Sequence, residues 1–184
     1  MNQSIDPKDE LVEHLPAMRA FALSLARNAA TADDLVQDTV VKAWSNLDKF
    51  EQGTNMRAWL FTILRNTYYS MHRKRKREVE DPEGVITEAL SEKPSHDGRL
   101  ALKDFREAFA QLPAEQREAL VLVGAEGFSY EDAAAMCGCA IGTIKSRTNR
   151  ARKRLAELMH LDDEDDLEMT DTATLAVVTG QPTA

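Results

Sequence analysis

Cysteine is scarce in this sequence. Cys137 and Cys139 are the only two, and one residue separates them. This spacing excludes a disulfide scaffold, and it favours a reducing, cytosolic compartment. A structural zinc site needs four ligands, and beyond this pair the nearest candidate is the distant His160. We therefore interpret the two cysteines as packing residues of a turn, and we expect no metal and no cofactor.

Membrane and catalytic signatures are missing as well. No apolar run approaches the roughly 18 residues that cross a bilayer. The N-terminus, MNQSIDPKDE, has neither the cationic nor the apolar region of a signal peptide. The chain also lacks an HExxH pair, a GxxxxGK(S/T) phosphate loop and a local Ser-His-Asp set. The sequence predicts a cytoplasmic protein that is not an enzyme, has no catalytic residues and has no membrane partner.

Acidic residues are absent from two windows of a chain that is acidic overall. The net charge is −8, with 31 Asp and Glu against 23 Lys and Arg. Residues 52–77 nevertheless carry seven cations and no acid, and residues 140–156 carry six and no acid. Fields are screened within about 10 Å at ordinary salt, so the local density of cations governs attraction to phosphate. The two windows predict two separate faces that bind nucleic acid.

Residues 9–78 are predicted to form a first small helical domain. Within it, residues 31–47 place their apolar side chains on one face of a helix. Thr31, followed three residues later by Asp34, resembles a capping box and predicts the start of this helix. Trp44 falls on the apolar face, so we expect it in the core.

A second helix of this domain follows a turn signal at Gly53. It has an apolar stripe from Met56 to Met71, and Trp59 on that stripe is expected in the core. Its reverse face is basic and aromatic, which fits a helix that packs on one side and meets a polyanion on the other. A merely solvated cationic face is the alternative, but such faces normally include acids for pairing.

Residues 79–99 read as a flexible linker that could also contain a brief helix, and residues 100–161 as a second small domain of four helices. Ser129 is predicted to cap a short helix that ends at Gly138, and a long basic helix follows. This is the layout of a helix-turn-helix. The small Ala134 allows close approach of the two helices, and Ile144 plugs their shared core. The basic helix can then present its outer face to a DNA major groove.

The second segment resembles region 4 of extracytoplasmic-function sigma factors, bacterial promoter-recognition subunits, in the run FSYEDAAAMCGCAIGTIKSRTNRARKRL. The first resembles their region 2 in the runs DDLVQDTVVKAW and FEQGTNMRAWLFTILRNTYYSMHRKRKR. The wording CGCAIGTIKSR is similar to the alphaproteobacterial general-stress-response subgroup. The resemblance implies an all-α fold of two small helical domains that initiates transcription in a stress response.

The resemblance also implies partners and residues. Core RNA polymerase, through its β′ clamp helices and β flap, promoter DNA and an anti-sigma factor are the implied partners. The residues matching the core-binding helix are Asp34, Leu35, Val36, Gln37 and Asp38; Leu35 and Val36 could instead be core residues only. Those matching the −10 region are Phe50, Asn55 and Asn66 for bases and Arg57, Arg65, Arg73, Lys74 and Arg75 for phosphates. Lys145, Ser146, Asn149 and Arg150 match the family's −35 contact positions. From the basic helix itself we also expect Gly142 and Thr143 on the DNA-facing side and Arg147 on a phosphate.

Two other functions are open at this point. A sigma-mimicking protein that sequesters an anti-sigma factor should lose its DNA-facing cations, and a dimeric operator regulator should have a sensor or dimer module instead of a second basic helix. Residues 162–184 begin with an acidic run and are expected to be disordered. They are either a solubilising tail or a competitor for the neighbouring cationic helix.

Overall fold

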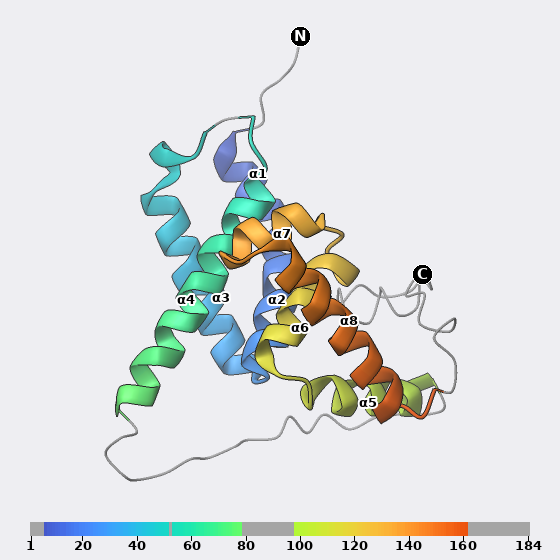
Figure 1. The fold of residues 1–184 in the computed structure, drawn as a ribbon. Helices are drawn as coiled ribbons and strands as arrows, with labels where there is room; N and C mark the ends of the chain where they lie inside the picture. Colours follow the sequence, from blue (N-terminus) through green and yellow to red (C-terminus); the bar gives the residue numbers. More distant parts are fainter. Residues whose placement is uncertain (1–5, 52, 79–97, 162–184) are drawn as a thin grey trace. The chain divides into compact units, whose positions relative to one another are not determined.

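The computed structural model describes residues 6–51, 53–78 and 98–161, and the chain divides into two units, residues 1–90 and 91–184 (Figure 1). Within the described ranges every regular element is a helix or a helical turn, which confirms the predicted all-α class. The predicted linker lies outside the described residues except for Gly98 and Arg99, which open a helix. The acidic tail, residues 162–184, lies outside them entirely.

The first unit contains α1 (Pro7–Glu13), α2 (Leu15–Ala26), α3 (Ala29–Ser45), the 3₁₀ turn η1 (Leu47–Lys49) and α4 (Met56–Glu78). α3 begins earlier than predicted. Asn28 is its N-cap, and the Asn28 side chain accepts a hydrogen bond from the Thr31 amide at 2.9 Å. Thr31 is therefore a donor inside the first turn, and the cap predicted there is wrong. Asn is among the best N-caps, and the two alanines after it extend the helix readily.

α2, α3 and α4 pack on one another around a core of large apolar side chains (Figure 1). Phe21 of α2 and Phe61 of α4 are both 0% exposed, and their rings stack with centroids 4.9 Å apart. Leu35 and Leu64 are also fully buried. Trp44 is 51% exposed, so its predicted place in the core is wrong. On α3 the buried Thr39 and Ala43 define the inward stripe, and Trp44 is turned about 100° from Ala43.

The second unit contains α5 (Gly98–Ala110), α6 (Ala114–Leu120), the π turn η2 (Val121–Ala125), α7 (Tyr130–Cys137) and α8 (Ile141–Leu158). Its core includes Leu112, Leu120 and Leu155, with the small Ala108 and Ala151 between them. The π turn was not predicted. It widens the end of α6 by one residue, so the Glu126 amide donates to the Val121 carbonyl at 2.9 Å.

The predicted helix-turn-helix details are confirmed. The Ser129 side chain accepts a hydrogen bond from the Asp132 amide at 3.0 Å and so caps α7. Gly138 ends α7 in the left-handed conformation, with φ of 63°. Ala134 is 3% exposed and Ile144 is 0% exposed, as their packing roles require. The α7–turn–α8 arrangement leaves the outer face of α8 in solvent.

Candidate nucleic-acid interface

A groove of about 390 Å³ lies in the first unit, between the end of α3 and the middle of α4. Its apolar part is made by Trp59, which is half-buried, and Ile63. Its polar lining consists of Lys42, Asn46, Lys49, Asn66, Thr67 and Ser70. A volume of a few hundred cubic ångströms suits a small ligand or one base of a nucleic acid. An aromatic face, two cations and amide groups are the combination that binds single-stranded nucleic acid.

Hydrogen bonds hold the polar side of this groove in place. Lys49 Nζ donates to Asn46 Oδ1 at 2.7 Å, and Asn46 Nδ2 donates to the Lys42 carbonyl at 2.8 Å. Lys42 Nζ donates to Thr67 Oγ1 at 3.0 Å, which links α3 to α4. Both ammonium groups are thus positioned by the protein itself. Such preorganisation reduces the entropy that binding must remove.

The three residues expected to hold −10 bases take different places. Asn66 is exposed and lines the groove. Phe50 is 8% exposed, and its ring centroid lies 5.2 Å from that of Trp59. Asn55 Oδ1 accepts a hydrogen bond from the Ala58 amide at 3.0 Å, which is the geometry of a cap on α4. Asn66 alone of the three therefore lies in the groove, while Phe50 and Asn55 shape its surroundings.

Sequence reasoning missed the groove cations Lys42 and Lys49. Both lie outside the acid-free window, because Asp48 and Glu51 are near them in the chain. Only their place in the fold reveals them: Lys42 lies on α3, which packs against α4, beside Thr67.

The cations of α4 fall into two groups. Arg57 and Arg65 lean on aromatic rings, with Cζ 5.6 Å from the Phe61 centroid and 4.7 Å from the Tyr69 centroid, respectively. Burial lowers the pKa of Arg57. The other group, at the C-terminal end of α4, is exposed and includes Arg73, Lys74 and Arg75. Only this second group has the exposure that a phosphate contact requires without rearrangement.

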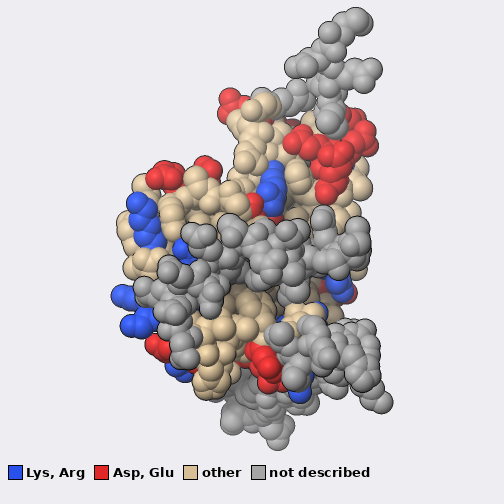
Figure 2. Space-filling view, turned by 90° about the vertical axis from the view of Figure 1, so that its right-hand side faces the viewer, with Lys and Arg blue, Asp and Glu red and all other residues tan. Residues whose placement is uncertain are grey.

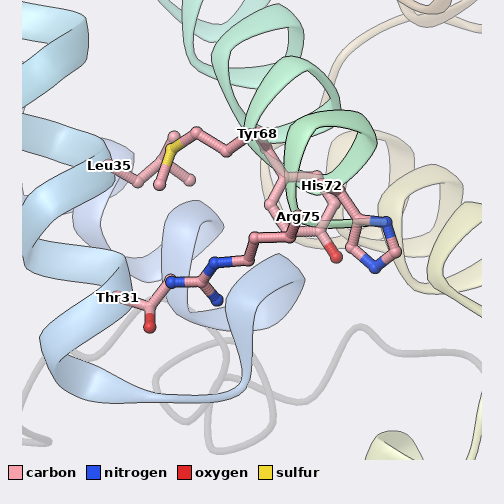
Figure 3. A pocket seen from close by; sticks show the side chains of 6 residues that line it. Thr31, Leu35, Tyr68, His72 and Arg75 are labelled. Carbon is pink, nitrogen blue, oxygen red and sulfur yellow. The ribbon is translucent and has the colours of Figure 1, made fainter. Parts of the chain in front are cut away.

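Arg75 also lines a small cavity between α3 and α4. Figure 3 shows its side chain extending from α4 toward Thr31 on α3, with Leu35, Tyr68 and His72 around the same space. The cavity has a volume of about 30 Å³, which leaves room for no more than a few water molecules. It is too small for a base, so it belongs to the packing between the two helices.

The predicted polymerase-binding residues of α3 are divided between surface and core. Asp34, Gln37 and Asp38 are exposed, and Val36 is half-buried. Leu35 is 0% exposed, so it packs in the core, as in the alternative stated for it.

Two large apolar side chains on α3 were not predicted as surface residues. Val41 is 65% exposed and Trp44 is 51% exposed. With Gln37 they follow the spacing i, i+4, i+7, which places all three on one face of the helix. Lys8 Nζ lies 5.1 Å from the Trp44 ring centroid and partly covers it. That spacing, read together with the acids beside it, could have revealed a mixed acidic and apolar face.

Figure 2 shows one face of the molecule, on which the red side chains of Asp and Glu gather near the top. On α1 and its cap, Asp6, Asp9 and Glu13 are exposed. Because a carboxylate repels phosphate, this part of the first unit is unsuited to nucleic acid. The groove and the cationic end of α4 are the parts of the first unit with the appropriate charge.

The predicted −35 residues lie along the outer side of α8. Gly142, Lys145, Asn149 and Arg150 are exposed, and Thr143, Ser146 and Arg147 are half-buried. Lys145 Nζ lies 5.6 Å from the Tyr130 ring centroid, and Ser146 Oγ donates to the Thr143 carbonyl at 3.0 Å. Four residues of the opposite face are buried: Ile144, Thr148, Ala151 and Leu155.

Arg147 is placed differently from the phosphate ligand that was expected. Its Nη2 donates to Glu115 Oε2 on α6 at 2.6 Å, and its side chain is only 20% exposed. Cys139, in the turn before α8, has its Sγ 4.0 Å from Arg147 Nη1. The guanidinium is thus already bound within the unit.

The residues that the structure describes include neither a cluster of metal ligands nor a membrane-spanning helix. No three metal-ligating side chains gather there in a way that could hold an ion. None of the helices in those ranges combines the length and the apolar character needed to cross a bilayer.

Comparison with known proteins agrees with this geometry. Residues 11–78 match the family model for sigma-70 region 2, and residues 102–155 match that for sigma-70 region 4. The chain is 53% identical over 165 residues to the ECF RNA polymerase sigma factor EcfG of Rhodopseudomonas palustris (strain TIE-1), covering 90% of this chain and 91% of that protein. It is 35% identical over 158 residues to the ECF sigma factor SigE of Mycolicibacterium smegmatis (strain ATCC 700084 / mc(2)155), covering 82% and 61%.

A solved structure is also similar. It is the sigma factor RpoE of Bartonella quintana in complex with the anti-sigma factor NepR, with 59% identity and a TM-score of 0.77, covering 85% of this chain and 98% of that one. Two regions match in the family's order, and more than half of the aligned residues are identical to those of a relative of similar length. The chain belongs to the extracytoplasmic-function sigma factors, in the EcfG-like subgroup.

Proposed function

We propose that the two units of this sigma factor divide promoter recognition between them: the groove of the first unit holds the −10 element, and the outer face of α8 reads the −35 element. Sigma factors bind core RNA polymerase and direct it to promoters, and the EcfG-like subgroup does so in the general stress response. The proposal concerns which residues of this chain perform each step. The observation that carries it is the groove between α3 and α4.

The groove suits an unpaired base better than a duplex. A base stacked on Trp59 and Ile63 would place its edge beside Asn66, whose amide offers both a donor and an acceptor. Lys42 and Lys49 stand on the side of the groove formed by α3 and η1, where they can neutralise the flanking phosphates. Extruding a base costs a few kcal/mol, and stacking on an aromatic side chain returns about 1–3 kcal/mol. The site can therefore both stabilise a melted strand and distinguish its bases.

The outer face of α8 suits a major groove. Lys145, Asn149 and Arg150 are exposed on one side of a helix of 18 residues, and these residue types read base edges and phosphates. The opposite side is buried against the unit's own core, which fixes the orientation of the helix. Two DNA sites that are each weak combine through their effective concentration when polymerase aligns them.

For the polymerase itself, the exposed face of α3 is the proposed contact. Gln37, Val41 and Trp44 form an apolar and amide strip beside Asp34 and Asp38. Such a strip fits the basic, coiled-coil β′ clamp helices. The β flap is proposed as a second contact, for the second unit.

An anti-sigma factor is the proposed regulatory partner, since the similar Bartonella protein was solved in complex with one. The cytoplasm, where core polymerase acts, is the proposed compartment. A decoy without DNA binding is disfavoured by the cations that remain exposed on α4 and α8.

The test is transcription reconstituted from core RNA polymerase and this chain. The wild-type chain should initiate at a promoter with paired −35 and −10 elements. Replacing Lys42 and Lys49 with Gln should reduce the salt dependence of binding to a single-stranded −10 oligonucleotide by about 1.4 in the slope of log K against log salt. Lys103→Gln is the matched control, because Lys103 is an exposed lysine of α5 paired with Glu107. Equal slopes for the double variant and the control would refute the groove as the −10 site.

A further inference from the structure

Glu115 and Arg147 join two helices that are 32 residues apart in the sequence. The 2.6 Å bond links α8 to the first turn of α6. The same guanidinium approaches Cys139 Sγ at 4.0 Å, in the turn that leads into α8. One side chain therefore spans α6, the turn and the recognition helix.

Arg147 differs from the other cations of α8 in its burial. Its side chain is 20% exposed, whereas that of Arg154 is 53% exposed. Arg147 follows Ile144 by three residues and precedes Ala151 by four, and both of these are 0% exposed. It therefore stands at the edge of the buried stripe of α8. From that edge, the guanidinium reaches α6.

We propose that Glu115 is a positioning residue for −35 recognition: by holding Arg147, it fixes α8 against α6 and keeps this cation from binding a DNA phosphate. This inference rests on the proposed function, since it concerns how α8 meets DNA. Glu115 lies in the first turn of α6, where the helix dipole favours a carboxylate. A charge-assisted bond of this length is also stronger than a neutral one. Lys145 and Arg150 then project from a helix whose orientation is set.

The salt dependence of promoter binding separates a bound cation from one that contacts phosphate. Each phosphate-bound cation adds about 0.9 to the magnitude of the slope of log K against log salt. The full-length chain, in complex with core polymerase, is titrated with a duplex promoter. That promoter is first identified by transcription with the same holoenzyme. Arg147→Gln should leave the slope unchanged, while Lys145→Gln should lower it by about 0.9. Glu115→Gln should raise it by about 0.9, because it releases Arg147 to the DNA.

The matched control is Glu157→Gln. Glu157 pairs with Arg154 on the same helix at 3.1 Å, and its removal changes the charge by the same amount. Because both side chains of that pair are about half exposed, Arg154 is already accessible, and the slope should stay at the wild-type value.

A second measurement reports orientation instead of charge. Discrimination between the cognate −35 sequence and a scrambled one should fall about fivefold in both Glu115→Gln and Arg147→Gln, near the lower end of what one base pair contributes. Arg147→Lys retains a cation opposite Glu115 and should keep most of the discrimination. Exchanging the two residues, as Glu115→Arg with Arg147→Glu, should restore it. A purely structural effect would lower helix content and weaken binding to the cognate and the scrambled −35 sequences equally.

Two results would overturn the inference: a loss of about 0.9 in slope for Arg147→Gln, or equal slopes for Glu115→Gln and Glu157→Gln. If circular dichroism shows that Glu115→Gln does not fold, Glu115→Asp takes its place, because it shortens the side chain by one methylene. An unchanged salt slope and unchanged −35 discrimination in Glu115→Asp would also overturn the inference. If Lys145→Gln leaves the slope unchanged as well, the proposed role of α8 fails as a whole, and that outcome is distinct from failure of the Glu115 inference.

Discussion

Asn66 offers a test in which function and stability move in opposite directions. It is exposed on α4 and lines the groove. Replacing it with Ala removes a donor and an acceptor from the groove and leaves the core intact. A good pair of hydrogen bonds to a base edge contributes about 1–3 kcal/mol of discrimination. Asn66→Ala should therefore weaken preference for the cognate −10 base by about 5- to 160-fold.

The same change should stabilise the fold. Ala exceeds Asn in helix propensity by up to about 0.7 kcal/mol at an exposed position. In a domain of this size about 0.5 kcal/mol raises the melting temperature by roughly 2–4 °C. A variant that loses promoter preference through misfolding would melt earlier instead, so the sign of the shift separates the two causes.

The assay pairs open-complex formation by reconstituted holoenzyme with binding of single-stranded −10 oligonucleotides that differ at one base. Asn149→Ala is the control, because Asn149 is an exposed asparagine of α8 and belongs to the other proposed DNA site. It should gain stability in the same way and leave −10 discrimination unchanged. Wild-type discrimination in Asn66→Ala would refute the assignment of Asn66 to base reading.

Three further predictions concern stability. Burial lowers the pKa of His14 below 6.5 despite the nearby carboxylate of Glu10. As pH falls below 6.5, the unfolded chain therefore binds a proton first, and the first unit should lose stability. Thermal unfolding of His14→Gln should lack this pH dependence. Phe61→Ala should reduce the free energy of unfolding by about 3–5 kcal/mol in urea titrations, because it empties a fully buried ring site; a loss below about 1 kcal/mol would contradict the stacked core. Gly138→Ala should reduce the free energy of unfolding by about 1–2 kcal/mol through backbone strain alone, since no atom lies within 4 Å of the added Cβ. An unchanged urea midpoint would show that the turn relaxes.

Local patterns predicted the fold well. The cap at Ser129, the left-handed turn at Gly138 and the buried Ile144 each depend on residues within a few positions of one another. The wrong predictions concern positions where a neighbouring residue takes the expected role. Asn28 is a better cap than Thr31, and only about 100° on α3 separates the exposed Trp44 from the buried Ala43.

The candidate site was less predictable, because it is made by packing. The groove joins α3, η1 and α4, and its bond from Lys42 to Thr67 spans 25 residues. Similarly, nothing local distinguishes Arg147 from the other cations of α8; the ion pair with Glu115 is visible only once α6 lies beside α8. Charge segregation located the interfaces, but it did not tell which cations are already engaged within the protein.

The length of α4 has a consequence for promoter architecture. Its 23 residues rise about 35 Å, and the 11 steps from Asn66 to Arg77 rise about 16 Å. A straight helix that contacts a base at its middle and phosphates at its end fixes the distance between these two contacts along the strand. Inserting or deleting a nucleotide within that interval should therefore penalise a promoter even when every recognised base is retained.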